Sequence, residues 1–250
     1  MERDKNEQGC ELIRPGTECF CLETHMHTSQ SSACGRGTPE EMAEAYKKAG
    51  YDGIIVTDHF MNGNSCIDPS LSWTEQVDCY CLAYEKAHRY GEKIGLSVFF
   101  GYEYNYNATE FITLGLEKKW LKAHPEIMTM PLEEYLRLVK KEGGLLIHVH
   151  PFREASYISK QRFFPDLTDA VEVINIGNKD KIFDRKARDF AIEHHLPMTS
   201  GSDCHAPWGK KGAGIAMDHK PSGIEDIMNC IRSGKGYTLL GETGSTNTLH

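Results

Sequence analysis

The chain has 250 residues and a formal net charge of −8; 40% of its residues are hydrophobic and 26% are charged. This composition is typical of a soluble globular protein with a buried core, and it does not indicate disorder. The acidic excess opposes broad adhesion to nucleic acid, which depends on clustered Lys and Arg. We therefore predict a single domain over residues 1–250, with a core at about 20–240, and a small-molecule substrate.

The sequence contains no run of about 18 apolar residues, and its first 20 residues lack the apolar centre of a signal peptide. Its nine cysteines are odd in number, and a chain of this length does not need disulfides. Cys19-x-Cys21 and Cys79-x-Cys81 lack the two-residue gap of zinc knuckles, so packing explains them more simply. We predict a cytoplasmic protein with reduced thiols.

Helix starts and short apolar runs alternate along the chain. Thr38-Pro39-Glu40-Glu41 combines a hydroxyl cap, a proline and a capping glutamate, which predicts a helix over about 39–49. Ser72 with Glu75, Pro131 before Leu132–Lys141, and Ser222 with Glu225 predict three more helices. Eight apolar runs have the length of buried strands: 19–22, 53–56, 96–100, 111–114, 145–149, 171–174, 197–199 and 237–240.

Strands that alternate with helices indicate right-handed crossovers and a mostly parallel sheet, and seven or eight such units would nearly close a barrel. The fold class we predict is therefore α/β, in the form of a barrel. Residues 62–70 and 102–109 are expected to be longer surface loops, and the polar tail 241–250 is expected to fray.

Polar residues of one kind follow successive predicted strands. In parallel barrels the loops that leave the carboxyl ends of the strands meet at one mouth, so residues distant in sequence come together there. Histidines at i and i+2 project to the same side of an extended segment, which applies to His25 with His27 and to His148 with His150. Imidazole with carboxylate suits zinc, manganese or iron, and the number of candidates indicates more than one ion. The candidate ligands are His25, His27, His59, Glu103, His150, Asp203 and His205.

Five motifs, in this order, resemble those of the polymerase and histidinol phosphatase (PHP) superfamily. They are His25-x-His27-Thr28, Thr57-Asp58-His59, a glutamate after the third strand (Glu103), His150-Pro151-Phe152-Arg153 and Ser202-Asp203-x-His205. The resemblance covers about residues 20–240. It implies a distorted seven-stranded TIM-like (β/α) barrel that carries two or three divalent transition metals.

The resemblance also implies how the ligands divide. His25, His27, Glu103 and Asp203 would hold one ion, Glu103 would bridge to a second near His150, and His59 with His205 would contact a third. The sequence departs from the family in two places. Cys34-Gly35-Arg36 stands where relatives often carry a third-site histidine or aspartate, and the segment 110–115 lacks a histidine that many relatives use for the second ion. Cys34 and His148 are therefore tentative ligands, with packing or a structural hydrogen bond as the alternative for each.

The chemistry expected of such a site is hydrolysis by a metal-activated water, with Asp203, His205 and Arg153 as the catalytic residues. The planar guanidinium groups of Arg153 and Arg36 could bind phosphate oxygens, although surface salt bridges would also account for them. We predict a phosphoesterase, with a phosphomonoester as the preferred substrate. A nucleotide phosphodiesterase or exonuclease and a non-catalytic metal-binding domain remain as alternatives, and the oligomeric state is open.

Overall fold

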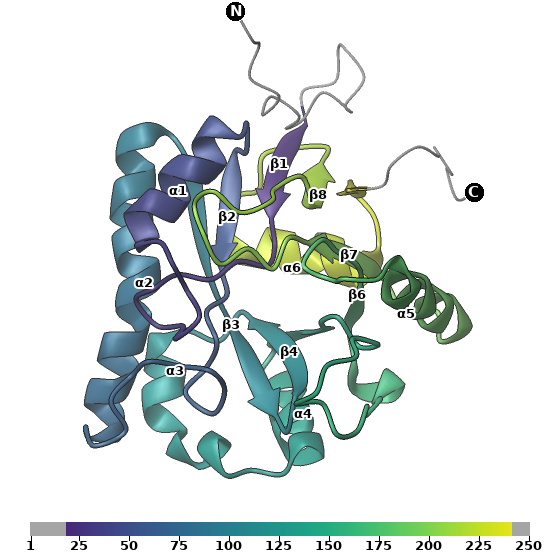
Figure 1. Cartoon of the computed structure of the whole chain (residues 1–250), viewed down its shortest axis with the longest axis horizontal. Helices are drawn as coiled ribbons and strands as arrows, with labels where there is room; N and C mark the ends of the chain where they lie inside the picture. The colour runs from purple at the N-terminus through teal and green to yellow at the C-terminus, as the bar shows by residue number, and fades with distance from the viewer. Residues whose placement is uncertain (1–18, 242–250) are drawn as a thin grey trace, which may run out of the picture.

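The computed structural model describes residues 19–241, which form six α-helices around one strongly curved sheet of nine strands (Figure 1). Along the sheet the strand order is β7-β6-β5-β4-β3-β2-β1-β8-β9. The strands are β1 Phe20–Glu23, β2 Gly53–Val56, β3 Ser97–Tyr106, β4 Thr109–Leu114, β5 Leu145–His148, β6 Ala170–Asn175, β7 Met198–Gly201, β8 Gly214–Met217 and β9 Tyr237–Leu240. The helices are α1 Pro39–Lys48, α2 Trp73–Ile94, α3 Lys118–Ala123, α4 Leu132–Lys141, α5 Lys181–Glu193 and α6 Ile224–Ser233.

The sheet curls into a nearly closed barrel, which confirms the predicted α/β TIM-like class. Helices α1 and α2 cover one flank of the sheet, and α5 covers another (Figure 1). The expectation of a mostly parallel sheet is wrong, however, because β4 runs antiparallel to both β3 and β5, and β8 runs antiparallel to both β1 and β9. The strand β8 and the helices α3 and α5 were not predicted.

A tight hairpin explains the largest difference from the sequence-based prediction. Residues 102–109, expected to be a loop, instead extend β3 to Tyr106 and turn directly into β4. Asn107 and Ala108 make this turn with φ angles of 50° and 62°. Two left-handed residues in succession are typical of a two-residue hairpin turn, but the usual sequence signal is a glycine in second place. Because Ala108 stands in this second place, the sequence lacks the usual signal of a hairpin turn.

Three of the four predicted helix starts are confirmed. Thr38 and Glu41 form the capping box of α1, since the backbone N–H of Thr38 donates to the Glu41 carboxylate at 2.8 Å. Glu75 likewise accepts from the backbone of Ser72 at 2.9 Å, and α4 begins directly after Pro131. The pairing of Ser222 with Glu225 is wrong, because the backbone N–H of Ser222 donates to Asp226 at 2.9 Å and α6 starts only after Gly223.

Ser200 on β7 joins the two ends of the curled sheet. Its buried hydroxyl accepts from the backbone N–H of Gly214 at 3.2 Å and donates to the carbonyl oxygen of Leu240 at 2.6 Å. These bonds connect β7 to β8 and to the end of β9, which lie at the other edge of the strand order. The barrel is therefore closed by side-chain bonds at a place where the strands share no ladder.

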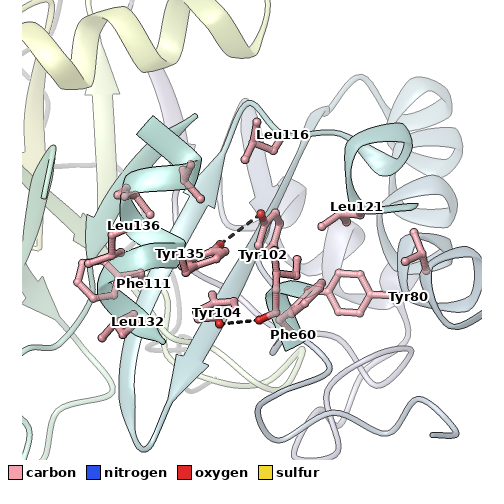
Figure 2. Close-up of a cluster of buried hydrophobic side chains, with 14 of the residues drawn as sticks. Phe60, Tyr80, Tyr102, Tyr104, Phe111, Leu116, Leu121, Leu132, Tyr135 and Leu136 are labelled. Atoms are coloured by element: carbon pink, nitrogen blue, oxygen red, sulfur yellow. Dashed lines mark hydrogen bonds between the residues drawn. The ribbon is translucent and has the colours of Figure 1, made fainter. Parts of the chain in front are cut away.

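Two apolar clusters support the barrel. In one, Ile227 and Met228 of α6 pack with residues of β1, β4, β5 and β8, at the end where the parallel strands begin. The other is rich in aromatic residues and lies where β3 and β4 meet α2 and α4; Figure 2 shows Tyr102 and Tyr135 of this cluster joined by a hydrogen bond of 3.3 Å between their hydroxyls. The aromatic cluster includes Phe60 and Phe111, which directly follow the polar residues His59 and Glu110 in the chain.

Within the described part of the chain, no helix combines the length and the apolar character needed to cross a bilayer. The cysteines described there form no disulfide. The predicted fraying of the tail concerns residues that, except for Gly241, lie outside the described range.

We expect Ser200→Ala to lower the free energy of unfolding by about 1–3 kcal/mol, because it leaves a buried N–H and a carbonyl without their partner. Denaturant unfolding followed by circular dichroism measures the change. Ser233→Ala is the matched control, since the exposed Ser233 hydroxyl bonds only to the nearby Cys230 carbonyl oxygen, and it should change stability by no more than about 0.5 kcal/mol. Equal effects of the two changes would contradict the role of Ser200.

Candidate metal centre

All the main candidate ligands lie at one end of the barrel. His25 and His27 follow β1, His59 follows β2, His150 follows β5, and Asp203 and His205 follow β7. Glu103 was expected after the third strand but lies inside β3, whose pairing with the β2 segment continues through His59. The predicted convergence of these residues at one mouth is what the structure shows.

Glu103 is at the middle of the group, and its carboxylate has no exposure to solvent. One oxygen, Oε1, lies 3.2 Å from Nε2 of His25 and 3.1 Å from Nε2 of His150. The other oxygen, Oε2, faces Nδ1 of His59 and lies 3.7 Å from Nε2 of His27. A single carboxylate thus contacts four histidines, as a bridging metal ligand would.

Asp203 and His205 complete the opposite side of the group. Oδ1 of Asp203 lies 3.2 Å from Nε2 of His27 and 3.6 Å from Nε2 of His25. The ring of His205 stacks on that of His27 with centroids 4.2 Å apart, and its Nδ1 lies 2.8 Å from the backbone oxygen of Asp203. This bond leaves Nε2 of His205 as the nitrogen available to a ligand.

The donor atoms fit divalent metal ions. Nε2 of His25, Nε2 of His27 and Oε2 of Glu103 are buried without a hydrogen-bond partner, although they face one another. Buried polar atoms in native proteins are rarely left unpaired, so such atoms require an explanation. Candidate ligand atoms lie within 4.8 Å of one another in several overlapping groups, which include His25-His27-Asp203, His25-Glu103-His150 and His27-His59-His205. Ions placed among these groups would satisfy the unpaired atoms.

The electrostatics of the site follow from buried charges of opposite sign. Burial opposes ionisation of Glu103, but the neighbouring His59 and His25 outweigh it and hold the pKa of Glu103 well below its usual range. Burial likewise lowers the pKa of His59, but the facing Glu103 and the adjacent Cys34 raise it to about 11. In the absence of metal, protons on His25 and His59 therefore balance carboxylate charge, whereas burial and the neighbouring His205 and His59 hold the pKa of His27 well below its usual range.

Glu110 and Glu172 are site residues that the sequence analysis missed. Glu110 opens β4, and its carboxylate oxygens lie 3.6 Å from Nε2 of His150 and 4.0 Å from Nδ1 of His59. Glu172 on β6 accepts from Nδ1 of His25 at 2.8 Å and from the backbone N–H of His150 at 3.0 Å. Neither residue follows a predicted parallel strand, which was the signal used; the hairpin at Asn107 would have revealed Glu110.

The tentative residues divide into two kinds. Cys34 lies beside the group: burial raises the pKa of its thiol, but the neighbouring His205 and His59 outweigh this and lower it to about 6. It belongs to none of the compact ligand groups found in residues 19–241. His148 does not reach it, since its ring stacks on Phe111 with centroids 4.4 Å apart and belongs to none of the ligand groups found in residues 19–241. The side chain of Arg36 is exposed, and only its backbone approaches the site, through an N–H bond of 2.7 Å to the His205 carbonyl oxygen.

Arg153 lies at the edge of the candidate centre. Its Nη2 donates to Oδ2 of Asp203 at 2.6 Å and to Asn175 at 3.0 Å, while its Nε donates to Asn178 at 2.9 Å. The two oxygens of Asp203 therefore face different partners, the histidines on one side and a fixed guanidinium on the other.

Two ligand positions have unusual backbones. His150 and Asp203 adopt positive φ angles of 33° and 52°. The N–H of His150 is bonded to Glu172, and that of Asp203 donates to the His25 carbonyl oxygen at 2.8 Å. Such conformations cost roughly 1–3 kcal/mol each and tend to cluster at functional sites.

Comparisons with known proteins place this architecture in a family. The PHP domain model matches residues 23–171, and the PHP-associated model matches residues 181–210. The chain belongs to the PHP family, whose members are metal-dependent phosphoesterases that bind several divalent ions. No curated protein matches the sequence.

Solved structures agree on the fold. A two-domain protein from Bacteroides vulgatus, described as containing a predicted PHP-like metal-dependent phosphoesterase, has a TM-score of 0.64 at 17% identity; the match covers 93% of this chain and 68% of that one. A protein from Bifidobacterium adolescentis assigned as a metal-dependent phosphoesterase has a TM-score of 0.54 at 15% identity, covering 87% and 97%. A lesion-specific endonuclease from Pyrococcus furiosus has a TM-score of 0.63 at 14% identity, covering 88% and 57%.

We expect Glu172→Gln to weaken metal binding by about 10- to 100-fold, because a carboxylate that fixes a ligand histidine controls both the orientation and the basicity of its ring. Equilibrium dialysis with manganese measures the affinity. Glu193→Gln, at an exposed position of α5, is the control and should bind as wild type does. If the two variants bind manganese equally well, Glu172 does not position His25.

We also expect metal binding to release protons at pH 7. The raised pKa of His59 means that its ring is protonated in the metal-free protein, whereas a ligand nitrogen must be neutral. The apparent affinity should therefore rise with pH, by about tenfold per unit for each proton released. Calorimetric titration in two buffers of different ionisation enthalpy counts the protons, and His59→Gln should release fewer. A binding heat independent of the buffer would refute this expectation.

Proposed function

We propose that this chain is a metal-dependent phosphomonoesterase that hydrolyses a small phosphorylated substrate. The observation that carries the proposal is a pocket beside the candidate metal centre, lined jointly by residues of the centre and by arginines. Two residues of the centre, Glu110 and His150, line it together with two arginines, Arg153 and Arg162.

The arginines suit a phosphate group. Arg153 is held in place by Asp203, Asn175 and Asn178, so its guanidinium loses little freedom when it binds phosphate oxygens. Arg162, which the sequence analysis did not single out, donates from Nη1 to the carbonyl oxygens of Asn107 and Lys160 at 3.2 Å each. The hairpin turn and the loop after β5 thus fix the second arginine at the pocket wall.

The residues of the chain would divide the work as follows. The ions would be held by the residues of the candidate centre: His25, His27, His59, Glu103, Glu110, His150, Asp203 and His205. Divalent ions at such a site activate water and stabilise the negative charge that develops on the phosphoryl oxygens. Asp203 would couple the two parts of the site, since one of its oxygens faces the ligand histidines and the other fixes the phosphate-binding Arg153. The thiols without disulfides fit a reducing cytoplasm, where we propose the protein works.

We expect protein reconstituted with manganese or zinc to hydrolyse an aryl phosphate monoester, and chelation to abolish the activity. Asp203→Asn should lower kcat/KM by about 100-fold or more, because it disturbs both the ions and Arg153. Asp189→Asn, at an exposed position of α5, is the matched control and should retain full activity.

Other outcomes would select the alternatives. Turnover of phosphodiesters or oligonucleotides in preference to monoesters would indicate a nuclease, the activity named for one structural neighbour. Full metal occupancy without turnover of any phosphate ester would indicate a metal-binding domain that does not catalyse hydrolysis. Either result would overturn the proposed phosphomonoesterase activity.

A further inference from the structure

The donor atoms of the candidate centre are not distributed evenly. On the side of β3 and β4, the carboxylates of Glu103 and Glu110 both lie near His150, at 3.1 and 3.6 Å from its Nε2. Ligand atoms of His59, Glu103 and Glu110 also form one compact group. This position is therefore rich in oxygen.

Two buried carboxylates beside each other need a cation between or near them, because like charges in a medium of low dielectric constant repel strongly. The side chain of Glu110 is only 11% exposed and that of Glu103 1%. A divalent ion held by both would relieve the repulsion, and Glu110 thus has the place of a ligand rather than of a surface acid.

The opposite side of the centre offers nitrogen and sulfur. The rings of His27 and His59 have centroids 4.3 Å apart, and His27 stacks on His205. The loop that carries Cys34 is held beside these rings, because the N–H of Arg36 donates to the carbonyl oxygen of His205 at 2.7 Å and the hydroxyl of Ser32 accepts from the N–H of His59 at 2.9 Å. The half-buried thiol of Cys34 thus lies next to imidazole nitrogen. Thiolate and imidazole are the donors that zinc prefers, whereas carboxylate oxygens suit manganese.

We infer that the centre sorts its metals by position: Glu110 biases the position near Glu103 and His150 toward manganese or iron(II), and Cys34 biases the position near His59 and His205 toward zinc. The inference rests on the proposed metal-dependent function, but it concerns which ion occupies which position. A single chain would then carry a mixed-metal centre. Replacing an oxygen donor by a nitrogen donor should therefore raise the zinc content of the protein relative to manganese.

The test is metal competition without turnover. Because manganese binds a given site more weakly than zinc, metal-free protein is dialysed against zinc and a large excess of manganese, and the retained ions are counted by mass spectrometry. Wild type should retain both metals, and Glu110→His should shift the zinc-to-manganese ratio toward zinc by about tenfold. Glu142→Gln, at an exposed position, should leave the ratio unchanged. Circular dichroism confirms that each variant is folded.

Cobalt substitution tests the sulfur ligand directly. Binding of Co²⁺ to wild type should produce a thiolate-to-cobalt charge-transfer band, which Cys34→Ser should remove. Cys66→Ser, at an exposed thiol that contacts the first loop, should retain the band. An unchanged metal ratio in Glu110→His, or the absence of the Cys34-dependent band, would overturn the inference. Sorting of metals by a protein that hydrolyses no phosphate ester would instead refute the proposed function alone.

Discussion

The buried carboxylate of Glu103 is the constraint on which the rest of the site depends. A charge removed from water costs several kcal/mol unless groups of opposite charge surround it. Four histidines from the ends of β1, β2 and β5 surround it, and their positions are fixed by where those strands end. Burial lowers the pKa of two of them, His25 and His59, but the neighbouring carboxylates outweigh it and raise both, so these two supply the opposite charge. Protons and divalent ions are two ways to supply the same positive charge. The same residues can therefore exist in a protonated, metal-free state and in a metal-bound state.

A shell of carboxylates behind the histidines keeps this arrangement in place. Glu172 fixes His25, and Asp58 binds the loop that carries His27 by accepting from the backbone of Thr28 and the hydroxyl of Ser32, both at 2.6 Å. The Ser32 hydroxyl in turn accepts from the backbone N–H of His59 at 2.9 Å. These hydrogen bonds therefore couple the loop that carries His27 to the segment that carries His59.

Sequence reasoning could predict that the candidate ligands gather at one end of the barrel, because they follow strands whose apolar runs are easy to recognise. It could not find Glu110, since that residue depends on a hairpin turn made by Asn107 and Ala108 without glycine. It left His148 open between a metal ligand and a structural residue. Alternation along an extended strand would turn it toward its neighbour His150, but the chain leaves the strand after His148 and His150 has a left-handed backbone. Glu172 was hidden for another reason, because it lies within a fully buried strand where only apolar residues were sought.

The left-handed backbones of His150 and Asp203 limit how this centre can evolve. Asparagine, aspartate and histidine enter that region more readily than most residues, whereas β-branched and bulky side chains are strongly disfavoured there. Ligands on the β3–β4 hairpin and in the first loop carry no such restriction, since Glu103, Glu110 and Cys34 have ordinary φ angles. Relatives that differ in metal preference should therefore vary first at positions 34 and 110. Positions 150 and 203 should accept only the few residue types that tolerate a left-handed backbone.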